Sequence, residues 1–146
     1  MAVHRSEYRV LFGDTDGMGI VYNANYLRIF EMARTEWSRS LLRKPKDMVD
    51  NDMYLVVVNA HINYHSPARY DDLLAMECWI PKAKVKRASF HFAYRVTHKD
   101  SGQIVATGYT VHALTTKEGK LKRMPKDLHG QVACLAIDEI PDVPSE

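Results

Sequence analysis

The chain of 146 residues has the length of one domain, and 46% of its residues are hydrophobic, which is enough to build a core. A formal net charge of +2 gives no indication of a nucleic-acid-binding protein. No run approaches the roughly 20 apolar residues of a membrane-spanning helix, and residues 1–14 lack the apolar run of a signal peptide. We therefore expect a cytoplasmic protein that binds no nucleic acid and has no membrane span.

The first predicted elements are a strand and a long helix. In residues 4–12 the chain alternates, with apolar side chains at every second position, which is typical of a half-buried strand. In residues 23–42 apolar side chains recur every three or four positions and form one stripe along a helix. Asn23 or Asn25 can cap the start of this helix, and Pro45 marks its end. The stripe comprises Tyr26, Phe30, Ala33, Trp37 and Leu41.

Four further strands are expected in the second half of the chain. They are separated by turn-forming sequences such as Ser66-Pro67 and Asp100-Ser101-Gly102. Strands joined by such short turns are usually antiparallel neighbours. Pro125 can begin a short terminal helix. The expected ranges are 54–65, 73–81, 89–97 and 103–116 for the strands and 125–135 for the helix.

One strand, one long helix and four strands, in this order, predict an α+β domain in which a five-stranded antiparallel sheet wraps around the helix. We assign residues 1–137 to this single domain and residues 138–146 to a loose acidic tail. A sheet around one helix leaves strand edges exposed, and pairing of edges across a two-fold axis removes that exposure. We therefore expect a homodimer or a homotetramer.

The segment between the first strand and the long helix combines turn residues with carboxylates. Gly13, Gly17 and Gly19 permit backbone conformations that are closed to other residues. Asp14 and Asp16 lie among them, close to a helix start, which offers unpaired N–H groups and a partial positive charge. Two interpretations stay open from the residues alone: the carboxylates brace the turn, or one of them acts on an acyl group held at the helix start.

Two motifs resemble those of hotdog-fold acyl-CoA thioesterases. The resemblance is to the branch that contains 4-hydroxybenzoyl-CoA thioesterase and the Tol-Pal-associated acyl-CoA thioesterases, and it extends over residues 8–125. It implies a hotdog fold and hydrolysis of an acyl-CoA thioester to free acid and CoA, a reaction that needs no cofactor. The first motif comprises Asp14-Thr15-Asp16, Gly19-Ile20-Val21-Tyr22, Asn25-Tyr26 and Phe30-Glu31-Met32-Ala33-Arg34, and the second comprises Tyr64, Ser66-Pro67-Ala68-Arg69 and Asp71-Asp72.

The resemblance implies different roles for the two carboxylates. Asp16 matches the catalytic carboxylate of the family, which acts as a direct nucleophile or as a general base for water, whereas Asp14 is expected to be structural. A backbone N–H near Asn23 is implied to polarise the thioester carbonyl. Several relatives carry His where this chain has Asn23, so any side-chain function of that His is absent or altered here, while the backbone donor is retained.

Substrate contacts are implied at two further places. Tyr22 and Asn25 are candidate substrate-binding residues next to the helix start, although capping and packing explain them nearly as well. Lys86 and Arg87 match basic residues that hold CoA near the partner subunit in the benzoyl-type enzymes. The acyl-CoA is the only ligand that the resemblance implies.

Other functions stay open. His61 and His65 could suggest a metal, but no third ligand is evident near them, so we expect no metal site. A non-hydrolytic module that binds acyl thioesters or an acyl-carrier protein fits the same fold, and a structural protein with a vestigial pocket is a third interpretation. The acyl group, the choice between CoA and carrier protein, and the choice between dimer and tetramer are left open by the sequence.

Overall fold

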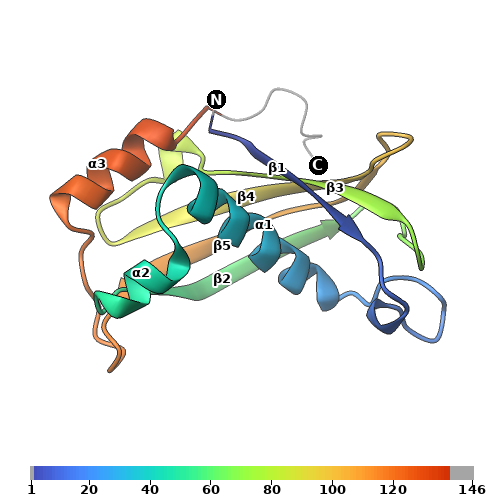
Figure 1. Ribbon diagram of the computed structural model, residues 1–146, viewed down its shortest axis with the longest axis horizontal. Coiled ribbons are helices and arrows are strands. Elements are labelled where there is room, and N and C mark those ends of the chain that lie inside the picture. The colour runs from blue at the N-terminus through green and yellow to red at the C-terminus, as the bar shows by residue number, and fades with distance from the viewer. Residues whose placement is uncertain (1, 139–146) are drawn as a thin grey trace.

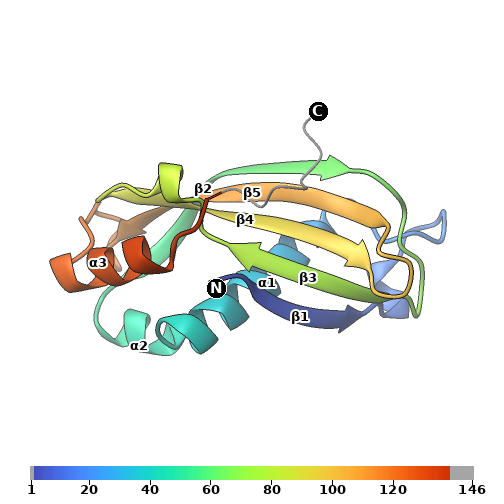
Figure 2. The same ribbon diagram turned by 90° about the horizontal axis from the view of Figure 1, so that it is seen from above.

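The computed structural model describes residues 2–138, so the predicted acidic tail lies outside the described residues except for Asp138. A five-stranded antiparallel sheet curves around one long helix, α1 (Asn25–Leu41), as Figures 1 and 2 show. The strand order is β1-β3-β4-β5-β2, so the first two strands of the chain form the two edges. This arrangement confirms the predicted hotdog architecture. The strands are β1 (His4–Arg9), β2 (Tyr54–Tyr64), β3 (Leu73–Trp79), β4 (Ser89–His98) and β5 (Ile104–Thr115).

Aromatic side chains of α1 pack against the inner face of the sheet. Phe30 is fully buried and stacks on Tyr94 of β4, with 4.2 Å between the ring centroids. Trp37 meets Phe92 edge to face at 5.2 Å. Gly108 of β5 makes room for this helix, because a Cβ at that position would lie 2.9 Å from the Phe30 ring. The predicted apolar stripe therefore forms the contact between helix and sheet.

The predicted side-chain cap of α1 is wrong. The N-cap residue is Ala24, whose backbone is already helical and whose side chain cannot accept a hydrogen bond. The Asn23 and Asn25 side chains instead bond to Ala24 N–H and to the Asp14 carbonyl. The helix ends at Leu41, before Pro45, which begins the next helix. The remaining helices are α2 (Pro45–Asp50) and α3 (Lys126–Leu135), and no helix within residues 2–138 is long and apolar enough to cross a membrane.

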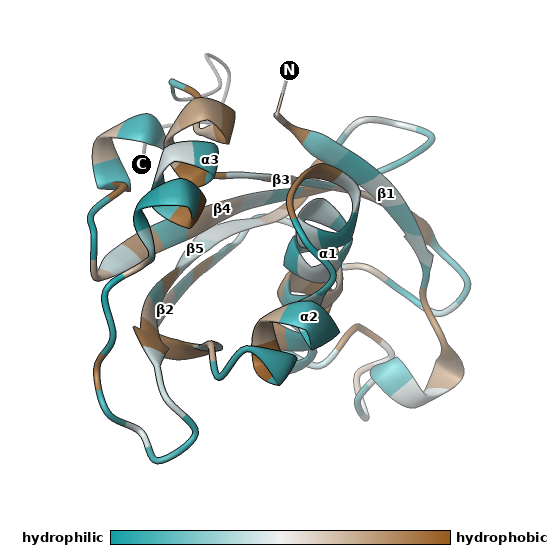
Figure 3. Ribbon diagram, turned by 60° about the vertical axis from the view of Figure 1, so that its left-hand side comes forward, coloured by the Kyte–Doolittle hydropathy of each residue, from teal (hydrophilic) through white to brown (hydrophobic). Residues whose placement is uncertain are grey.

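The edge strand β2 exposes apolar side chains. Its register with β5 shifts between Val57 and Asn59, so this strand contains a β-bulge. The extra residue, Val58, is 59% exposed, and Val57 is 46% exposed. Figure 3 shows this hydrophobic stretch of β2 beside α2 at the edge of the sheet. The single chain therefore leaves an apolar strand edge uncovered.

Candidate active site

The turn between β1 and α1 brings Asp16 to the helix start. After a short 3-10 turn at Phe12–Asp14, the chain folds back so that the Asp16 N–H donates to the Ile20 carbonyl over 2.9 Å. Gly19 has a φ of +77°, a left-handed conformation that suits glycine because it lacks a Cβ. The predicted turn is confirmed, and its return places Asp16 next to the residues that lead into α1.

Asp14 is half-buried and is held by hydrogen bonds to the strand, the turn and the helix start. Its Oδ2 accepts hydrogen bonds from the Tyr8 hydroxyl at 2.6 Å and from the Leu11 N–H at 2.7 Å. Its carbonyl accepts the Tyr22 N–H at 2.9 Å and the Asn25 side-chain amide at 2.8 Å. Burial, reinforced by the bond to Asp14, raises the pKa of Tyr8 to about 12. Asp14 thus ties the strand, the turn and the helix start together, as the structural interpretation predicted.

In the part of the chain that the structure describes, the carboxylate of Asp16 is bonded only within its own turn. Its side chain is half-buried, and Oδ1 accepts the Met18 N–H at 2.9 Å, an Asx turn that fixes the side-chain direction. Within residues 2–138 this is the only hydrogen bond to its carboxylate, and no cation forms an ion pair with it. The second carboxylate oxygen is free for a ligand.

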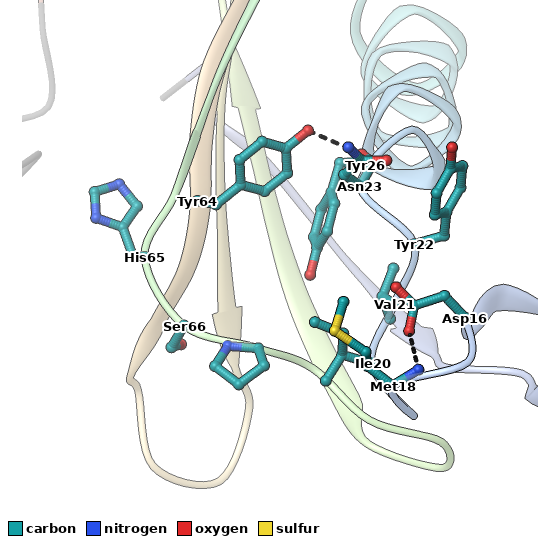
Figure 4. Close-up of a pocket in the computed structure, with 11 residues that line it drawn as sticks. Asp16, Met18, Ile20, Val21, Tyr22, Asn23, Tyr26, Tyr64, His65 and Ser66 are labelled. Carbon is teal, nitrogen blue, oxygen red and sulfur yellow. Dashed lines mark hydrogen bonds between the residues drawn. The ribbon is translucent and has the colours of Figure 1, made fainter.

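A pocket of about 520 Å³ opens beside this carboxylate. Figure 4 shows the turn residues on one side, and Tyr64 with the segment after β2 on the other. Most of the lining side chains are apolar or aromatic, and the polar groups come from Asp16, Asn23, His65, Ser66 and the tyrosine hydroxyls. This composition suits a small organic group whose polar atoms meet a few fixed partners. The pocket is lined by Asp16, Met18, Ile20, Val21, Tyr22, Asn23, Tyr26, Tyr64, His65, Ser66 and Pro67.

The peptide groups on both sides of Asn23 are held by hydrogen bonds. The Tyr22 carbonyl accepts the Asn25 N–H at 2.9 Å, and the Asn23 carbonyl accepts the Tyr64 hydroxyl at 3.0 Å. The Asn23 side chain accepts the Ala24 N–H at 2.8 Å. The N–H of Asn23 itself donates to no acceptor within residues 2–138. A backbone N–H without an acceptor in the described part of the chain therefore belongs to a residue that lines the pocket.

The far wall of the pocket consists of residues to which the sequence interpretation gave no role. Tyr64 packs edge to face on Tyr26 with 5.5 Å between ring centroids. Burial raises the pKa of Tyr26 to about 12. Ser66 donates to the Ile104 carbonyl at 2.7 Å, which holds the segment after β2 against β5. Tyr64 and Ser66-Pro67 belong to the second motif of the resemblance. Their place in that motif is the feature of the sequence that could have indicated a role in the site.

Three predicted site residues do not line the pocket of this chain. The Asn25 side chain is engaged with the Asp14 carbonyl. Lys86 and Arg87 precede β4, whose first residue pairs with Ala113, whereas Tyr64 pairs with Ala106 near the other end of β5. Arg87 donates to the Met124 carbonyl at 2.8 Å, and Lys86 is exposed. The two basic residues therefore lie at the opposite end of the sheet from Asp16.

The histidines near the pocket have other partners. His61 bonds to the Asn63 side chain at 2.9 Å, and His65 bonds to the Thr107 hydroxyl at 2.9 Å. Within residues 2–138 no group of three His, Cys, Asp or Glu side chains is arranged to hold a metal ion.

Comparisons with known proteins agree on one family. Residues 10–132 match the family model described as the thioesterase-like superfamily. The chain is 33% identical over 123 residues to the acyl-CoA thioesterase YbgC of Haemophilus influenzae, covering 82% of this chain and 87% of that protein. It is 28% identical over 128 residues to the 1,4-dihydroxy-2-naphthoyl-CoA hydrolase of Synechocystis, covering 86% and 91% of the two chains.

The fold comparison points the same way. The crystal structure of a 1,4-dihydroxy-2-naphthoyl-CoA thioesterase from Synechocystis superimposes with a TM-score of 0.79 at 25% sequence identity, over 89% of this chain and 95% of that one. The match to the family model covers most of the chain, including the turn, the long helix and all the strands after it. The protein therefore belongs to the thioesterase-like superfamily, as the two sequence motifs predicted.

Proposed function

We propose that the protein hydrolyses acyl-CoA thioesters to a free acid and CoA. The observation that carries the proposal is the pairing of two unused groups in one pocket: a carboxylate oxygen of Asp16 and the backbone N–H of Asn23. A thioester carbonyl requires these two groups, one to attack or to activate water and one to stabilise the oxygen that becomes negative. The names of the relatives support a CoA ester as substrate.

The Asn23 N–H acts as the oxyanion donor. Within residues 2–138 this N–H donates no hydrogen bond to the backbone. The N-terminus of α1, which begins at Asn25, adds a favourable partial positive charge behind it. A donor that is already aimed at the developing oxyanion contributes about 3–4 kcal/mol to transition-state stabilisation. Because the donor belongs to the backbone, it does not depend on whether residue 23 is Asn or His.

The carboxylate of Asp16 completes the chemistry by one of two routes. As a nucleophile, it bonds to the acyl carbon while the C–S bond breaks, and water then hydrolyses the resulting anhydride. As a general base, it takes a proton from a water whose oxygen attacks the same carbon. In both routes the CoA sulfur leaves as a thiolate and takes up a proton from solvent.

The same pocket supplies a place for the acyl group. Met18, Ile20, Val21 and Tyr26 present apolar surface beside the reacting groups. We assign Tyr22 to the pocket mouth, because it is 51% exposed there. Burial of the acyl group against these side chains positions the thioester carbonyl between Asp16 and the Asn23 N–H without a metal or a redox group.

We also propose that a second copy of the chain completes the site. Two β2 strands paired across a two-fold axis cover the exposed valines and supply the missing backbone partners at this edge. Such antiparallel pairing places the Tyr54 end of one β2 beside the Tyr64 end of the other. Val56 and Ser89 both pair with Ala113, so Lys86 and Arg87 belong to the Tyr54 end.

Lys86 and Arg87 of the second copy then approach the pocket of the first. Their positive charges suit the phosphates of CoA.

The variant Val57→Asp tests this interface, because it places a charge at the paired edge. We expect light scattering to show monomers of this variant, and we expect its KM for acyl-CoA to rise about tenfold or more. Val49→Asp on α2 is the matched control, because Val49 is 45% exposed and Val57 is 46% exposed. A Val57→Asp variant that keeps the wild-type mass and KM contradicts the β2 interface.

A panel of thioesters tests the function itself. Acyl-CoA and acyl-carrier-protein thioesters of aliphatic and aromatic acids are incubated with the purified protein, and free thiol is measured over time. Release of CoA thiol with at least one acyl-CoA is the expected result. Binding of the esters without thiol release would instead establish a binding module, and the absence of both binding and release would indicate a vestigial pocket.

A further inference from the structure

Tyr64 joins two parts of the site that are distant in sequence. It is the last residue of β2, and its hydroxyl donates to the carbonyl of Asn23 at 3.0 Å, across 41 positions of the chain. Its ring packs edge to face on Tyr26 and lines the pocket. In Figure 4 its hydroxyl points to the helix start and not into the pocket. The side chain is 54% exposed, so burial alone does not account for its orientation.

The hydroxyl acts on the peptide group that follows Asn23. That carbonyl lies 3.4 Å from the Tyr26 N–H, a long bond for the first turn of a helix. The Tyr64 hydroxyl is therefore its shorter partner. The peptide group before Asn23 is fixed separately, because its carbonyl accepts the Asn25 N–H at 2.9 Å. A peptide group is planar, so the Asn23 N–H lies in the same plane as the Tyr22 carbonyl. The Tyr64 bond holds the next peptide plane, which shares the Asn23 Cα with the first, so the two bonds together restrain that Cα and the direction of the N–H.

We propose that Tyr64 is a positioning residue that aims the Asn23 N–H at the thioester oxygen. This inference rests on the proposed hydrolysis and adds a residue to it. Tyr64 touches neither the reacting carbonyl nor Asp16, and it acts through the backbone of Asn23. A donor that is a few tenths of an ångström out of place loses part of its benefit in the transition state, where the oxygen becomes charged. Ground-state binding of the acyl group depends on it much less.

The hydroxyl can be removed without removing the ring. Tyr64→Phe keeps the contact with Tyr26 and is expected to lower kcat about tenfold while KM changes less than about threefold. Tyr70→Phe is the matched control, because Tyr70 is 59% exposed and does not line the pocket. It is expected to keep the wild-type kcat and KM. If Tyr64 had a purely structural role, Tyr64→Phe would not lower kcat while leaving KM nearly unchanged.

A spectroscopic measurement separates positioning from any other loss of rate. An acyl-CoA with a 13C-labelled thioester carbonyl is bound to an Asp16→Asn background, in which it persists, and its infrared carbonyl stretch is recorded. The Asn23 N–H is expected to shift the stretch to lower frequency relative to free substrate. Adding Tyr64→Phe is expected to reduce that shift, and adding Tyr70→Phe is expected to leave it unchanged.

The outcomes distinguish this inference from the proposed function. If the wild-type protein releases thiol but Tyr64→Phe retains the wild-type kcat and carbonyl shift, the positioning role is wrong and the hydrolysis stands. If the wild-type protein releases no thiol from any ester, the hydrolysis is wrong and the positioning role falls with it. A lower kcat with a nearly unchanged KM and a smaller carbonyl shift supports both.

Discussion

Two aspartates, separated by one residue in a single turn, show how differently the same side chain can be held by its surroundings. Asp14 has its carboxylate and its carbonyl occupied by four protein groups from the strand, the turn and the helix start. Asp16 accepts the Met18 N–H at its carboxylate and the Gly19 N–H at its carbonyl, both from its own turn, and its carboxylate lines the pocket. The comparison teaches that the contacts of a carboxylate, more than its place in a motif, indicate whether it is free to react.

The largest expected effect is on turnover. Asp16→Asn keeps the shape and the bond from the Met18 N–H but removes the charge. Steady-state thiol release is expected to fall about 10³-fold, because neither an amide nucleophile nor an amide base replaces the carboxylate. Thermal unfolding should stay close to that of the wild type. Asp71→Asn is the control, since Asp71 is exposed, has a φ of 70° that Asn tolerates, and carries the same charge.

The next effect is on stability. Asp14→Ala leaves the Tyr8 hydroxyl and the Leu11 N–H without their acceptor. We expect the free energy of unfolding, measured with urea, to fall by about 1–3 kcal/mol. The backbone carbonyl of residue 14 still accepts its two bonds, so the folded variant should lose less than about tenfold in kcat. An Asp14→Ala variant that is fully stable but inactive would reverse the roles of the two aspartates.

The smallest effect is on the titration of Tyr8, whose pKa is about 12 because of burial and the bond to Asp14. In Asp14→Ala the pKa should fall towards 10 without reaching it, since burial remains, and in Asp16→Asn it should stay near 12. A folded-state pKa above the unfolded value gives stability that is present below pH 10 and lost as the pH rises from 10 to about 12. Carbon-13 NMR of the tyrosine rings follows this titration. If the pKa of Tyr8 changed equally in Asp14→Ala and Asp16→Asn, the bond between Tyr8 and Asp14 would not be what distinguishes the two aspartates.

Much of the fold could be predicted from local patterns. The stripe of Tyr26, Phe30 and Trp37 has helical spacing, and the same side chains are buried against the sheet. The strands follow the turn-forming sequences that separate them. Helix periodicity and turns depend on residues that are close in sequence, so the sequence alone is enough to predict them.

The remainder depends on tertiary contacts. The hydrogen bond from Tyr64 to Asn23 joins residues 41 positions apart, and no local pattern specifies it. The Asn23 and Asn25 side chains looked like caps, but the fold gives them backbone partners outside the capping geometry. The shift at Val58 arises from the pairing of β2 with β5, which spacing along β2 alone does not reveal.

The most direct measurement of the central claim separates binding from bond breaking. Asp16→Asn is mixed in excess with an acyl-CoA that the wild type hydrolyses, the fraction of bound ester is measured, and thiol release is followed for a single turnover. We predict an affinity close to that of the wild type and a bound thioester that persists at least about 10³-fold longer. Release of thiol from the bound ester at a rate near that of the wild type would show that the Asp16 carboxylate does not perform the chemistry.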